Sequence, residues 1–340
     1  MIAICWDHWM PAGWPRMFPF EVFLFFFFVL TGYLITGSLL RERVRSEAGG
    51  GPWKAQALKI YQIRRGLRIL APYYAALLLA VIVGAPDVLP ALGWYLFHLS
   101  NIHIATLGYW PVGTNHFWSL AIQQQFYLVW PLVIWLLPRK CLAWAIVAFS
   151  VIGPVARMFH DDLLPWFVWP QVLTWASFDY FGIGGLLALA VHRGMALDSR
   201  GLRWLSLAAL AGYIGIFGAH ALDWPTYGLR PFQQTLLAVA ICGCIAMGSV
   251  GFTGWLKIVL EHPAIQRIGK LSYGVYLFHN LAPLIAGKLF WFLWADPFRN
   301  WGGVILNFIA FAALTWGLAL ASWRWIELPL QEVRAKVAPR

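Results

Sequence analysis

Charged side chains are scarce in this 340-residue sequence. Aspartate, glutamate, lysine and arginine together make up 11% of it, against about 25% in a typical soluble protein. So few charges cannot cover a water-facing surface, and most of the surface must therefore face something else. Acidic residues are the rarest, 14 against 25 lysines and arginines, and the net charge is +11. In a soluble protein this excess would indicate nucleic acid; in a membrane protein the positive-inside rule explains it, and we expect no nucleic-acid partner.

Residue patterns that mark other classes of protein are missing as well. The four cysteines form no CxxC pair, and the histidines of the 86–116 segment lack the spacing of an HExxH zinc motif, so we expect no metal ion. No signal peptide and no transporter-like repeat is evident. The longest connections between apolar runs, 41–68 and 86–116, are too short for a soluble domain, which predicts one transmembrane domain over residues 1–340.

Long apolar runs fill most of the chain. Hydrophobic residues make up 61% of the sequence, and the mean hydropathy is +0.66. Most runs approach the roughly 20 residues that a helix needs to cross a bilayer. The sequence therefore predicts an all-α, polytopic integral membrane protein with about ten transmembrane helices. The predicted spans are 1–9, 20–40, 69–85, 117–137, 141–156, 177–191, 204–221, 232–252, 271–293 and 302–323. The first is too short to cross alone, so we expect either that the true start lies upstream or that the first helix is truncated.

The lysines and arginines fall on alternate sides of these spans. The connections 41–68, 138–140, 192–203 and 253–270 and the terminal segment 324–340 hold 20 of them, whereas the opposite connections hold four. Cytoplasmic loops carry the excess of positive charge, so the richer side is predicted to face the cytoplasm. An even number of spans then places both termini in the cytoplasm.

Six short motifs occur in a fixed order along the chain. They are CWDHW around His8, FFVLTGYLIT (27–36), RRGLRILAPYY (64–74), WSLAIQQQFYLVWP (118–131), IGKLSYGVYLFHN (268–280) and ASWRWIELPL (321–330). Each is weak alone, but the ordered set resembles the acyltransferase 3 family, bacterial membrane enzymes that O-acylate cell-surface carbohydrates. The resemblance covers nearly the whole chain and implies a location in the bacterial cytoplasmic (inner) membrane.

The resemblance implies a membrane O-acyltransferase. Such an enzyme moves an acyl group, such as acetyl, from cytoplasmic acyl-CoA to a hydroxyl of a cell-surface or lipid-linked glycan, for example a polysaccharide or lipopolysaccharide. Acyl-CoA is then the donor, and no permanently bound cofactor is expected. The implied partners are the lipid bilayer, acyl-CoA and the carbohydrate acceptor.

Three arginines at the start of a span are the candidate donor site. Arg65 and Arg68, and likewise Arg64 and Arg68, share one face of a helix because they are three and four residues apart. A guanidinium group binds phosphate oxygens in pairs, and acyl-CoA carries several phosphates. Topology anchoring alone would also place arginines here. The resemblance favours acyl-CoA binding.

His8 is the candidate catalytic residue, since the resemblance aligns it with the histidine late in the family's first span. An imidazole near neutral pH can act as a general base for a sugar hydroxyl, or it can attack the thioester and carry the acyl group itself. The sequence leaves both mechanisms open. Ser119, Tyr276 and His279 stand in the later motifs, and we expect them along the substrate path.

The family carries two glutamates where this sequence has Gln123 and Gln124. The resemblance makes Gln123 a second catalytic candidate, although an amide can only hydrogen-bond where a carboxylate accepts a proton. The two glutamines therefore keep an alternative open: the protein is a catalytically inactive paralogue, or a glycan or lipid transporter on the same scaffold.

Overall fold

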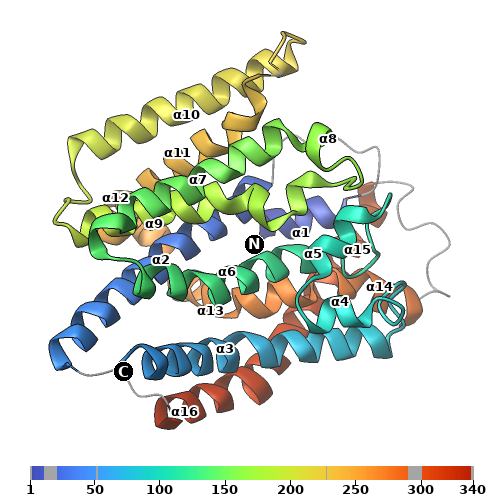
Figure 1. Ribbon diagram of the computed structural model, residues 1–340. Helices are drawn as coiled ribbons and strands as arrows, with labels where there is room; N and C mark the ends of the chain where they lie inside the picture. Colours follow the sequence, from blue (N-terminus) through green and yellow to red (C-terminus); the bar gives the residue numbers. More distant parts are fainter. Residues whose placement is uncertain (1, 11–20, 51–52, 227, 290–300, 338–340) are drawn as a thin grey trace.

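The computed structural model describes residues 2–10, 21–50, 53–226, 228–289 and 301–337. All regular elements within these ranges are helical, which confirms the predicted fold class (Figure 1). The α-helices are α1 (Ile2–Trp9), α2 (Glu21–Gly49), α3 (Lys54–Ile82), α4 (Leu92–Leu96), α5 (Ser100–Thr106), α6 (Phe117–Leu136), α7 (Leu142–Met158), α8 (His160–Leu163), α9 (Phe178–His192), α10 (Arg200–Ala221), α11 (Arg230–Val250), α12 (Gly254–Leu260), α13 (Pro263–Phe278), α14 (Leu281–Leu289), α15 (Trp301–Ser322) and α16 (Leu328–Val337). Short 3₁₀ turns are η1 (Arg139–Cys141), η2 (Pro170–Val172) and η3 (Thr174–Ser177), and a π-helical turn, η5 (Trp323–Glu327), joins α15 to α16.

Seven helical segments in the described part of the chain are long and apolar enough to cross a membrane. They correspond to seven of the ten predicted spans and contain α2, α3, α7, α9, α10, α11 and α15. The other three predicted spans are not among these seven segments, each for a separate reason. α1 has only eight residues, α6 has 20 residues that include three glutamines, and the predicted 271–293 span is divided between α13 and α14, with residues 290–293 outside the described ranges.

The basic connections lie together at one end of the bundle. The C-terminal end of α2, the start of α3, η1, the start of α10, α12 and α16 are all at the left of Figure 1. The predicted outer connections, including α4, α5 and α8, are at the right of that view. The helix arrangement therefore gives the bundle two ends that differ in charge. Arg16 and Arg299, two of the four arginines of the opposite side, lie outside the described residues.

α2 and α9 pack closely because glycines remove side chains from their contact. A Cβ atom on Gly32 would lie 2.1 Å from the Phe181 carbonyl oxygen, and one on Gly184 would lie 2.0 Å from that of Val29. Phe28 and Phe181 fill the space beside these glycines, with ring centroids 4.9 Å apart. This contact forms the centre of the largest hydrophobic core.

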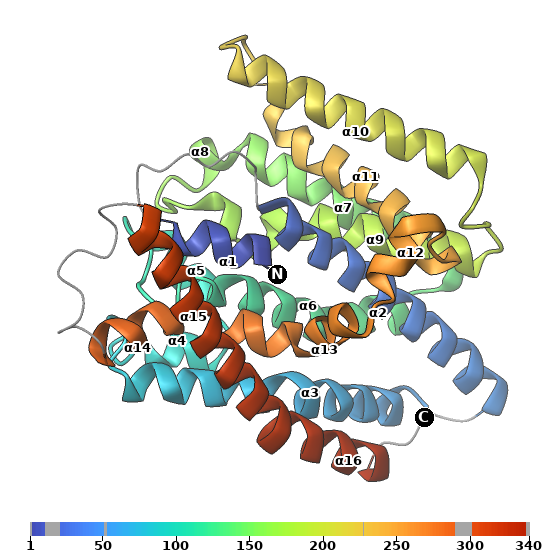
Figure 2. The ribbon, with the colours of Figure 1, turned by 180° about the vertical axis from the view of Figure 1, so that it is seen from behind.

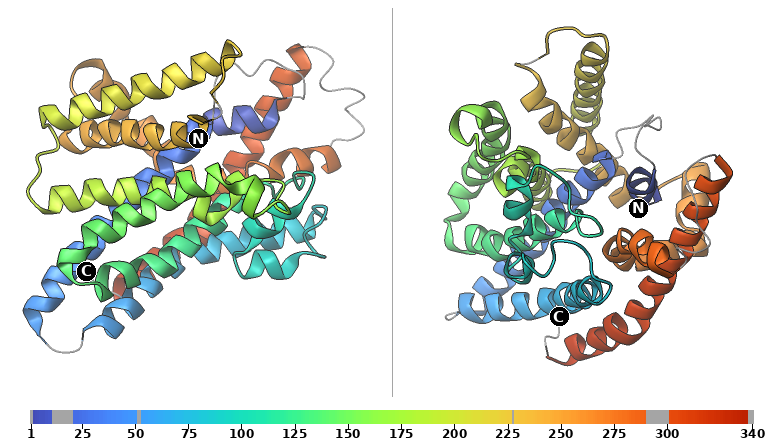
Figure 3. Two further views of the ribbon diagram at one scale, coloured as in Figure 1. Left: turned by 45° about the horizontal axis from the view of Figure 1, so that its top comes forward. Right: turned by 90° about the vertical axis from the view of Figure 1, so that its right-hand side faces the viewer.

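α1 lies in the half of the bundle that contains α4, α5 and α8, and α10 lies at the edge of the bundle. Figure 2 shows α1 beside α15, and Trp9 packs edge-on against Phe308 and Phe311, with centroids 5.0 and 5.7 Å away. The view along the bundle in Figure 3 shows α10 outside the other helices, where α11 is its main neighbour. α1 is therefore placed to contribute to an internal site.

Candidate active site

His8 is held by the segment where α13 ends. Its Nδ1 lies 2.7 Å from Nε2 of His279, and the planes of the two rings are nearly parallel, 10° apart. The Trp9 indole donates a hydrogen bond of 2.9 Å to the His279 carbonyl oxygen. That oxygen can accept it because Pro283, four residues later, has no N–H to complete the helical bond. α1 is thus attached to the α13–α14 junction through two successive residues.

The hydrogen bonds determine which nitrogen of each imidazole carries the proton. Nδ1 of His279 is 2.6 Å from the Tyr276 carbonyl oxygen, which can only accept, so this Nδ1 carries hydrogen. In neutral His279 the Nε2 atom is then an acceptor, and His8 must donate from its Nδ1. In a neutral His8 ring, Nε2 is therefore the unprotonated nitrogen and carries the basic lone pair. His8 is exposed whereas His279 is fully buried, so the basic nitrogen belongs to the accessible ring.

A third histidine, His116, and two asparagines complete the cluster. His116 Nε2 lies 3.0 Å from the Leu277 carbonyl oxygen and donates to it, which leaves its Nδ1 as an acceptor. The Asn280 amide is 3.3 Å from that Nδ1 and 2.5 Å from Asn115 Oδ1. Its two hydrogens are used by these acceptors, so its 3.1 Å approach to His8 Nδ1 is a contact between two donors. Burial, and next the charge of His8, lower the pKa of His116 to about 3, consistent with a neutral ring.

Ser119 and Tyr276 extend the cluster toward the interior. The Tyr276 hydroxyl forms a hydrogen bond with the Ser119 hydroxyl, and Ser119 Oγ is 3.0 Å from the His116 carbonyl oxygen. Of the predicted site residues, the structure thus brings together His8, His279, Tyr276 and Ser119.

A cavity of about 320 Å³ opens beside His8. It is lined by Ile4, Asp7, His8, Leu24, Phe25, Trp110, Asn115, His116, Trp118, Gln171 and Tyr276. Both polar groups and aromatic side chains therefore line the cavity. Within the described ranges, no group of three or more His, Cys, Asp or Glu side chains is arranged to hold a metal ion.

The three predicted donor-site arginines line a second cavity, of about 490 Å³. Arg64, Arg65 and Arg68 share it with Ser38, Leu39, Glu42, Ala57, Ile60, Tyr61, Trp135, Arg334 and Ala335. The Arg65 guanidinium lies over the rings of Tyr61 and Tyr127, 5.7 and 5.5 Å from their centroids. These aromatic contacts hold one cation at the wall of the cavity.

The two cavities lie near opposite ends of the same helices. The start of α2 (Leu24 and Phe25) lines the His8 cavity, and its later part (Ser38 to Glu42) lines the arginine cavity. Between them, the Tyr273 hydroxyl donates 2.8 Å to the Ile69 carbonyl oxygen and joins α13 to α3. Ile69 follows Arg68 directly, and Tyr273 precedes Tyr276 by about one helical turn. A polar contact therefore links the neighbourhoods of the two sites.

Gln123 does not join the histidines. It donates a hydrogen bond of 2.9 Å to Thr31 on α2, while the neighbouring Gln124 is buried with its Oε1 unpaired. Gln125 donates hydrogen bonds to the His98 carbonyl oxygen and to Asn101 on α5. The catalytic role of Gln123 stays a prediction, and its observed contact is between helices.

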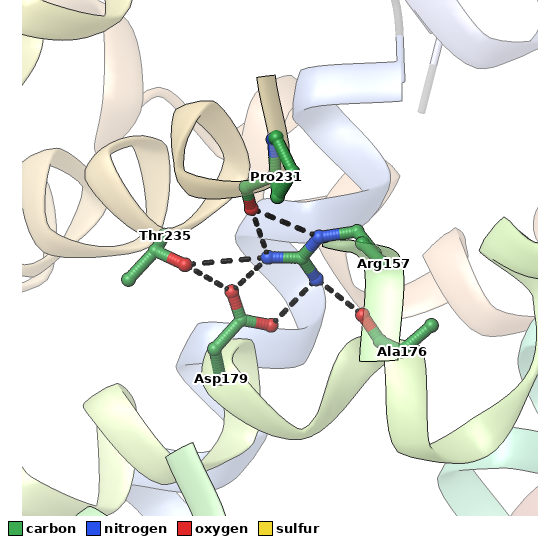
Figure 4. A network of polar contacts seen from close by, with 5 residues as sticks. All are labelled: Arg157, Ala176, Asp179, Pro231 and Thr235. Carbon is green, nitrogen blue, oxygen red and sulfur yellow. Dashed lines mark hydrogen bonds and ion pairs between the residues drawn. The ribbon is translucent and has the colours of Figure 1, made fainter. Parts of the chain in front are cut away.

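A buried ion pair joins the ends of three helices, α7, α9 and α11 (Figure 4). Arg157 on α7 binds both carboxylate oxygens of Asp179 on α9, at 2.6 and 3.1 Å, and Thr235 on α11 donates to the same carboxylate at 2.6 Å. Arg157 also donates to the carbonyl oxygens of Ala176 and Pro231. The network thus connects α7, α9 and α11 to one another. It also holds η3 through Ala176, shortly after Gln171 in the chain.

Sequence reasoning gave no role to His116, Asn115 or Asn280. The contacts that join residues 115–116 to residues 277–280 span more than 160 positions along the chain, so no local spacing connects these two segments. One usable signal was the position of His116, two residues before Trp118 of the fourth motif, at the start of α6.

These observations define a polytopic helical membrane protein with a histidine-centred cavity near one end and an arginine-lined cavity near the other. The model of the acyltransferase domain family (acyltransferase 3) matches residues 1–324, and the chain belongs to this family. The family membership indicated by the motifs is thereby confirmed, and with it the assignment to the acyltransferases. That residues 1–340 form one domain stays a prediction.

Curated relatives are similar at low identity. Peptidoglycan O-acetyltransferase OatA of Listeria monocytogenes is 26% identical over 90% of this chain and 50% of its own length. Nodulation protein 10 of Rhizobium leguminosarum bv. viciae is 23% identical over 92% of this chain and 83% of its own length. O-acetyltransferase OatA of Staphylococcus aureus is 32% identical over 90% of this chain and 52% of its own length. The chain thus spans about half the length of the two OatA proteins. No solved structure matches it.

Proposed function

We propose that this protein is a bacterial membrane O-acyltransferase that moves an acyl group, such as acetyl, from cytoplasmic acyl-CoA to a hydroxyl of a cell-surface or lipid-linked glycan. The observation that carries the proposal is the His8–His279 pair, which leaves a basic Nε2 on an accessible ring beside a cavity. The names of the OatA relatives, which are O-acetyltransferases, support acetyl as the group and a carbohydrate as the acceptor.

His8 serves this reaction as the proton acceptor. Its Nε2 takes the proton of the sugar hydroxyl while the oxygen attacks the thioester carbonyl carbon. The carbon–sulfur bond then breaks, and the proton passes to the departing thiolate, which leaves as free CoA. In the alternative, Nε2 attacks the thioester carbonyl carbon first, the carbon–sulfur bond breaks and CoA leaves as the thiolate. The sugar hydroxyl then attacks the acyl-imidazole, the carbon–nitrogen bond breaks, and the hydroxyl proton passes by way of the imidazole to the thiolate. Both routes require the same unprotonated nitrogen.

The arginine cavity is the proposed site of the CoA phosphates. Arg64, Arg65 and Arg68 supply planar, permanently charged donors at the basic end. The pantetheine arm is flexible, so the phosphates can rest there while the thioester reaches toward His8. We place the basic end and both termini in the cytoplasm, which lets the acyl group cross without CoA leaving that compartment.

The test measures transfer of labelled acetyl from acetyl-CoA to envelope glycan in membrane vesicles. We expect His8→Ala to lower the rate about 10²- to 10⁴-fold, the usual contribution of a general base. The matched control is His220→Ala, because His220 is exposed at the outer end of α10, far from both cavities. A His8→Ala rate equal to that of wild type would contradict the catalytic assignment.

A second arm tests the donor site. Arg65→Lys/Arg68→Lys keeps the charge but loses the paired donors, which corresponds to about 1.5–3 kcal/mol or roughly tenfold to 150-fold in the half-saturating concentration of acetyl-CoA. Arg45→Lys is the control, since the Arg45 side chain is 71% exposed and does not line the cavity. If the half-saturating concentration of acetyl-CoA did not change, these arginines would serve only to anchor the topology of the protein. Absence of transfer by the wild type would favour the inactive paralogue or transporter.

A further inference from the structure

Part of the His8 cavity lining is not required by acyl transfer itself. Trp110, Trp118 and Gln171 line the cavity together with Asp7. The first three come from three separate segments: the α5–α6 connection, α6 and η2. Flat apolar faces beside an amide and a carboxylate are the groups that a sugar ring needs. Its C–H faces pack on the electron-rich faces of aromatic rings, and its hydroxyls hydrogen-bond to polar side chains.

The wall that carries these residues is held in place by buried polar groups. Gln125 donates to the His98 carbonyl oxygen at 2.7 Å and to Asn101 Oδ1 at 2.9 Å. Asn101 in turn donates to the Val172 carbonyl oxygen at 3.2 Å and to Thr174 Oγ1 at 2.9 Å. This network joins α6, α5 and the η2–η3 segment, so Gln171 sits on backbone that is fixed from two sides.

Trp110 is supported in the same way. Its ring lies 5.1 Å from that of Trp169, centroid to centroid. The Trp169 and Val168 amides both donate to the Ala105 carbonyl oxygen, at 3.2 and 2.7 Å. Trp110 itself is 36% exposed, so one part of the side chain packs on the wall while another remains accessible. The Arg157–Asp179 network fixes the far end of the same segment (Figure 4).

The size of the cavity limits what it can hold. At about 320 Å³ it is at the small end of ligand pockets, which span roughly 300–1,000 Å³. A single sugar ring fits, whereas a CoA nucleotide together with its pantetheine arm does not. The arginine cavity, which carries the cations, is the separate site suited to the phosphates.

We propose that Trp110, Trp118 and Gln171, with Asp7, form the acceptor subsite, which binds one pyranose ring of the glycan beside His8. This inference rests on the proposed function and adds to it the position of the acceptor. Stacking on a tryptophan face orients the ring, and hydrogen bonds to Gln171 and Asp7 select its hydroxyls. One hydroxyl is thereby presented to Nε2 of His8. The wall is preformed, so binding does not have to order a loop.

The experiment distinguishes an effect on acceptor binding from an effect on donor binding. Membrane vesicles from a deletion strain complemented with each variant are supplied with labelled acetyl-CoA and with de-O-acetylated envelope polysaccharide from the same strain. The half-saturating concentration is measured for each substrate in turn. We expect Trp110→Ala and Gln171→Ala each to raise the half-saturating concentration of polysaccharide about tenfold, the usual effect of truncating an anchor residue. The half-saturating concentration of acetyl-CoA should stay unchanged.

The matched control is Trp166→Ala. Trp166 is 62% exposed in the same outer segment and does not line the cavity. An equal rise in Trp166→Ala and Trp110→Ala would mean that both tryptophans anchor the protein at the interface, and it would overturn the subsite. So would an unchanged polysaccharide dependence in Trp110→Ala, or a change in the acetyl-CoA dependence alone.

A conservative variant covers the case in which Trp110→Ala fails to accumulate. Trp110→Phe then replaces it, and we expect a smaller rise because the phenyl face is smaller. A polysaccharide dependence equal to that of wild type in both Trp110→Phe and Gln171→Ala would overturn the subsite while leaving the proposed function intact. Failure of the wild type to transfer acetyl at all would overturn the proposed function itself.

Discussion

The tautomers of the paired histidines His8 and His279 depend on one carbonyl oxygen, that of Tyr276. Because this oxygen can only accept, His279 donates from Nδ1 and accepts from His8 at Nε2. The sequence predicted His279 along the substrate path, but it does not line the cavity, and we propose instead that it positions His8 by selecting its tautomer. The Asn280 amide donates to Asn115 and His116, although it also approaches His8 Nδ1 to 3.1 Å.

Substitution of His279 tests this relation. His279→Ala removes the acceptor for His8 Nδ1, so either tautomer becomes available, and we expect kcat to fall by about tenfold or more, a fraction of what a general base contributes. His279→Gln places an amide oxygen near the lost Nε2 and should restore most of the rate. The half-saturating concentration of acetyl-CoA should not change in either variant. Equal rates for His279→Ala and His279→Gln, at matched protein levels, would indicate a packing role.

How far the site could be predicted from the sequence depends on distance along the chain. His8, His279 and Tyr276 stand in recognisable motifs, so the sequence alone makes them candidates. Their pairing was not predictable, because His8 and His279 are 271 residues apart and meet only through tertiary packing. The roles of the individual site residues stay predictions until variants are measured.

Among the helices, the α2–α9 contact gives the motif around Gly32 its physical meaning. Gly32 and Gly184 bring backbones together where a methyl group would overlap a carbonyl oxygen. α2 also contributes to both cavities, since its opposite halves line them. The sequence marked Gly32 as part of a motif, but nothing in it paired this residue with α9.

Replacement of Gly184 tests this contact. A Cβ at that position would lie 2.0 Å from the Val29 carbonyl oxygen, so Gly184→Ala must force α2 and α9 apart, at a cost of about 1–3 kcal/mol or more. We expect a lower midpoint of thermal unfolding in detergent. Gly215→Ala on α10 is the control, since a Cβ there meets nothing within 4 Å, and alanine favours a helix by up to about 1 kcal/mol over glycine. A midpoint for Gly184→Ala equal to that of Gly215→Ala would refute the close contact.

Two of the predicted spans, α6 and residues 271–293, show the limits of prediction from hydropathy. The glutamines of α6 lower its hydropathy, yet Gln123 and Gln125 are paired with groups on α2 and α5. A polar residue inside a span is tolerated when it is paired in this way. The predicted 271–293 span is interrupted at residues 279–280. Pro283 was the available signal, because proline cannot donate to the residue four positions earlier.

At the scale of the whole molecule, the two ends of the bundle carry different chemistry. The arginine cavity and the basic connections share one end, and the His8 cavity and its aromatic wall lie toward the other. A donor that enters from the basic end and an acceptor that enters from the aromatic end would meet within the protein. The seven long helices and the family could be predicted from composition and motifs. The residues that line each cavity could not, because they come together only through the packing of distant helices.

Membrane orientation is the prediction at this scale. The charge bias places residue 50, in the α2–α3 connection, in the cytoplasm and Arg230, at the start of α11, on the outer side. Cysteines are introduced singly at these positions after the four native ones are replaced, because Cys244 is exposed and would react. In intact cells a membrane-impermeant maleimide should label Arg230→Cys and not Gly50→Cys; after permeabilisation both should react. Labelling of Gly50→Cys in intact cells would show that the protein has the opposite orientation. The arginine cavity would then face away from the cytoplasm, and acyl-CoA could not be proposed as the ligand of Arg65 and Arg68.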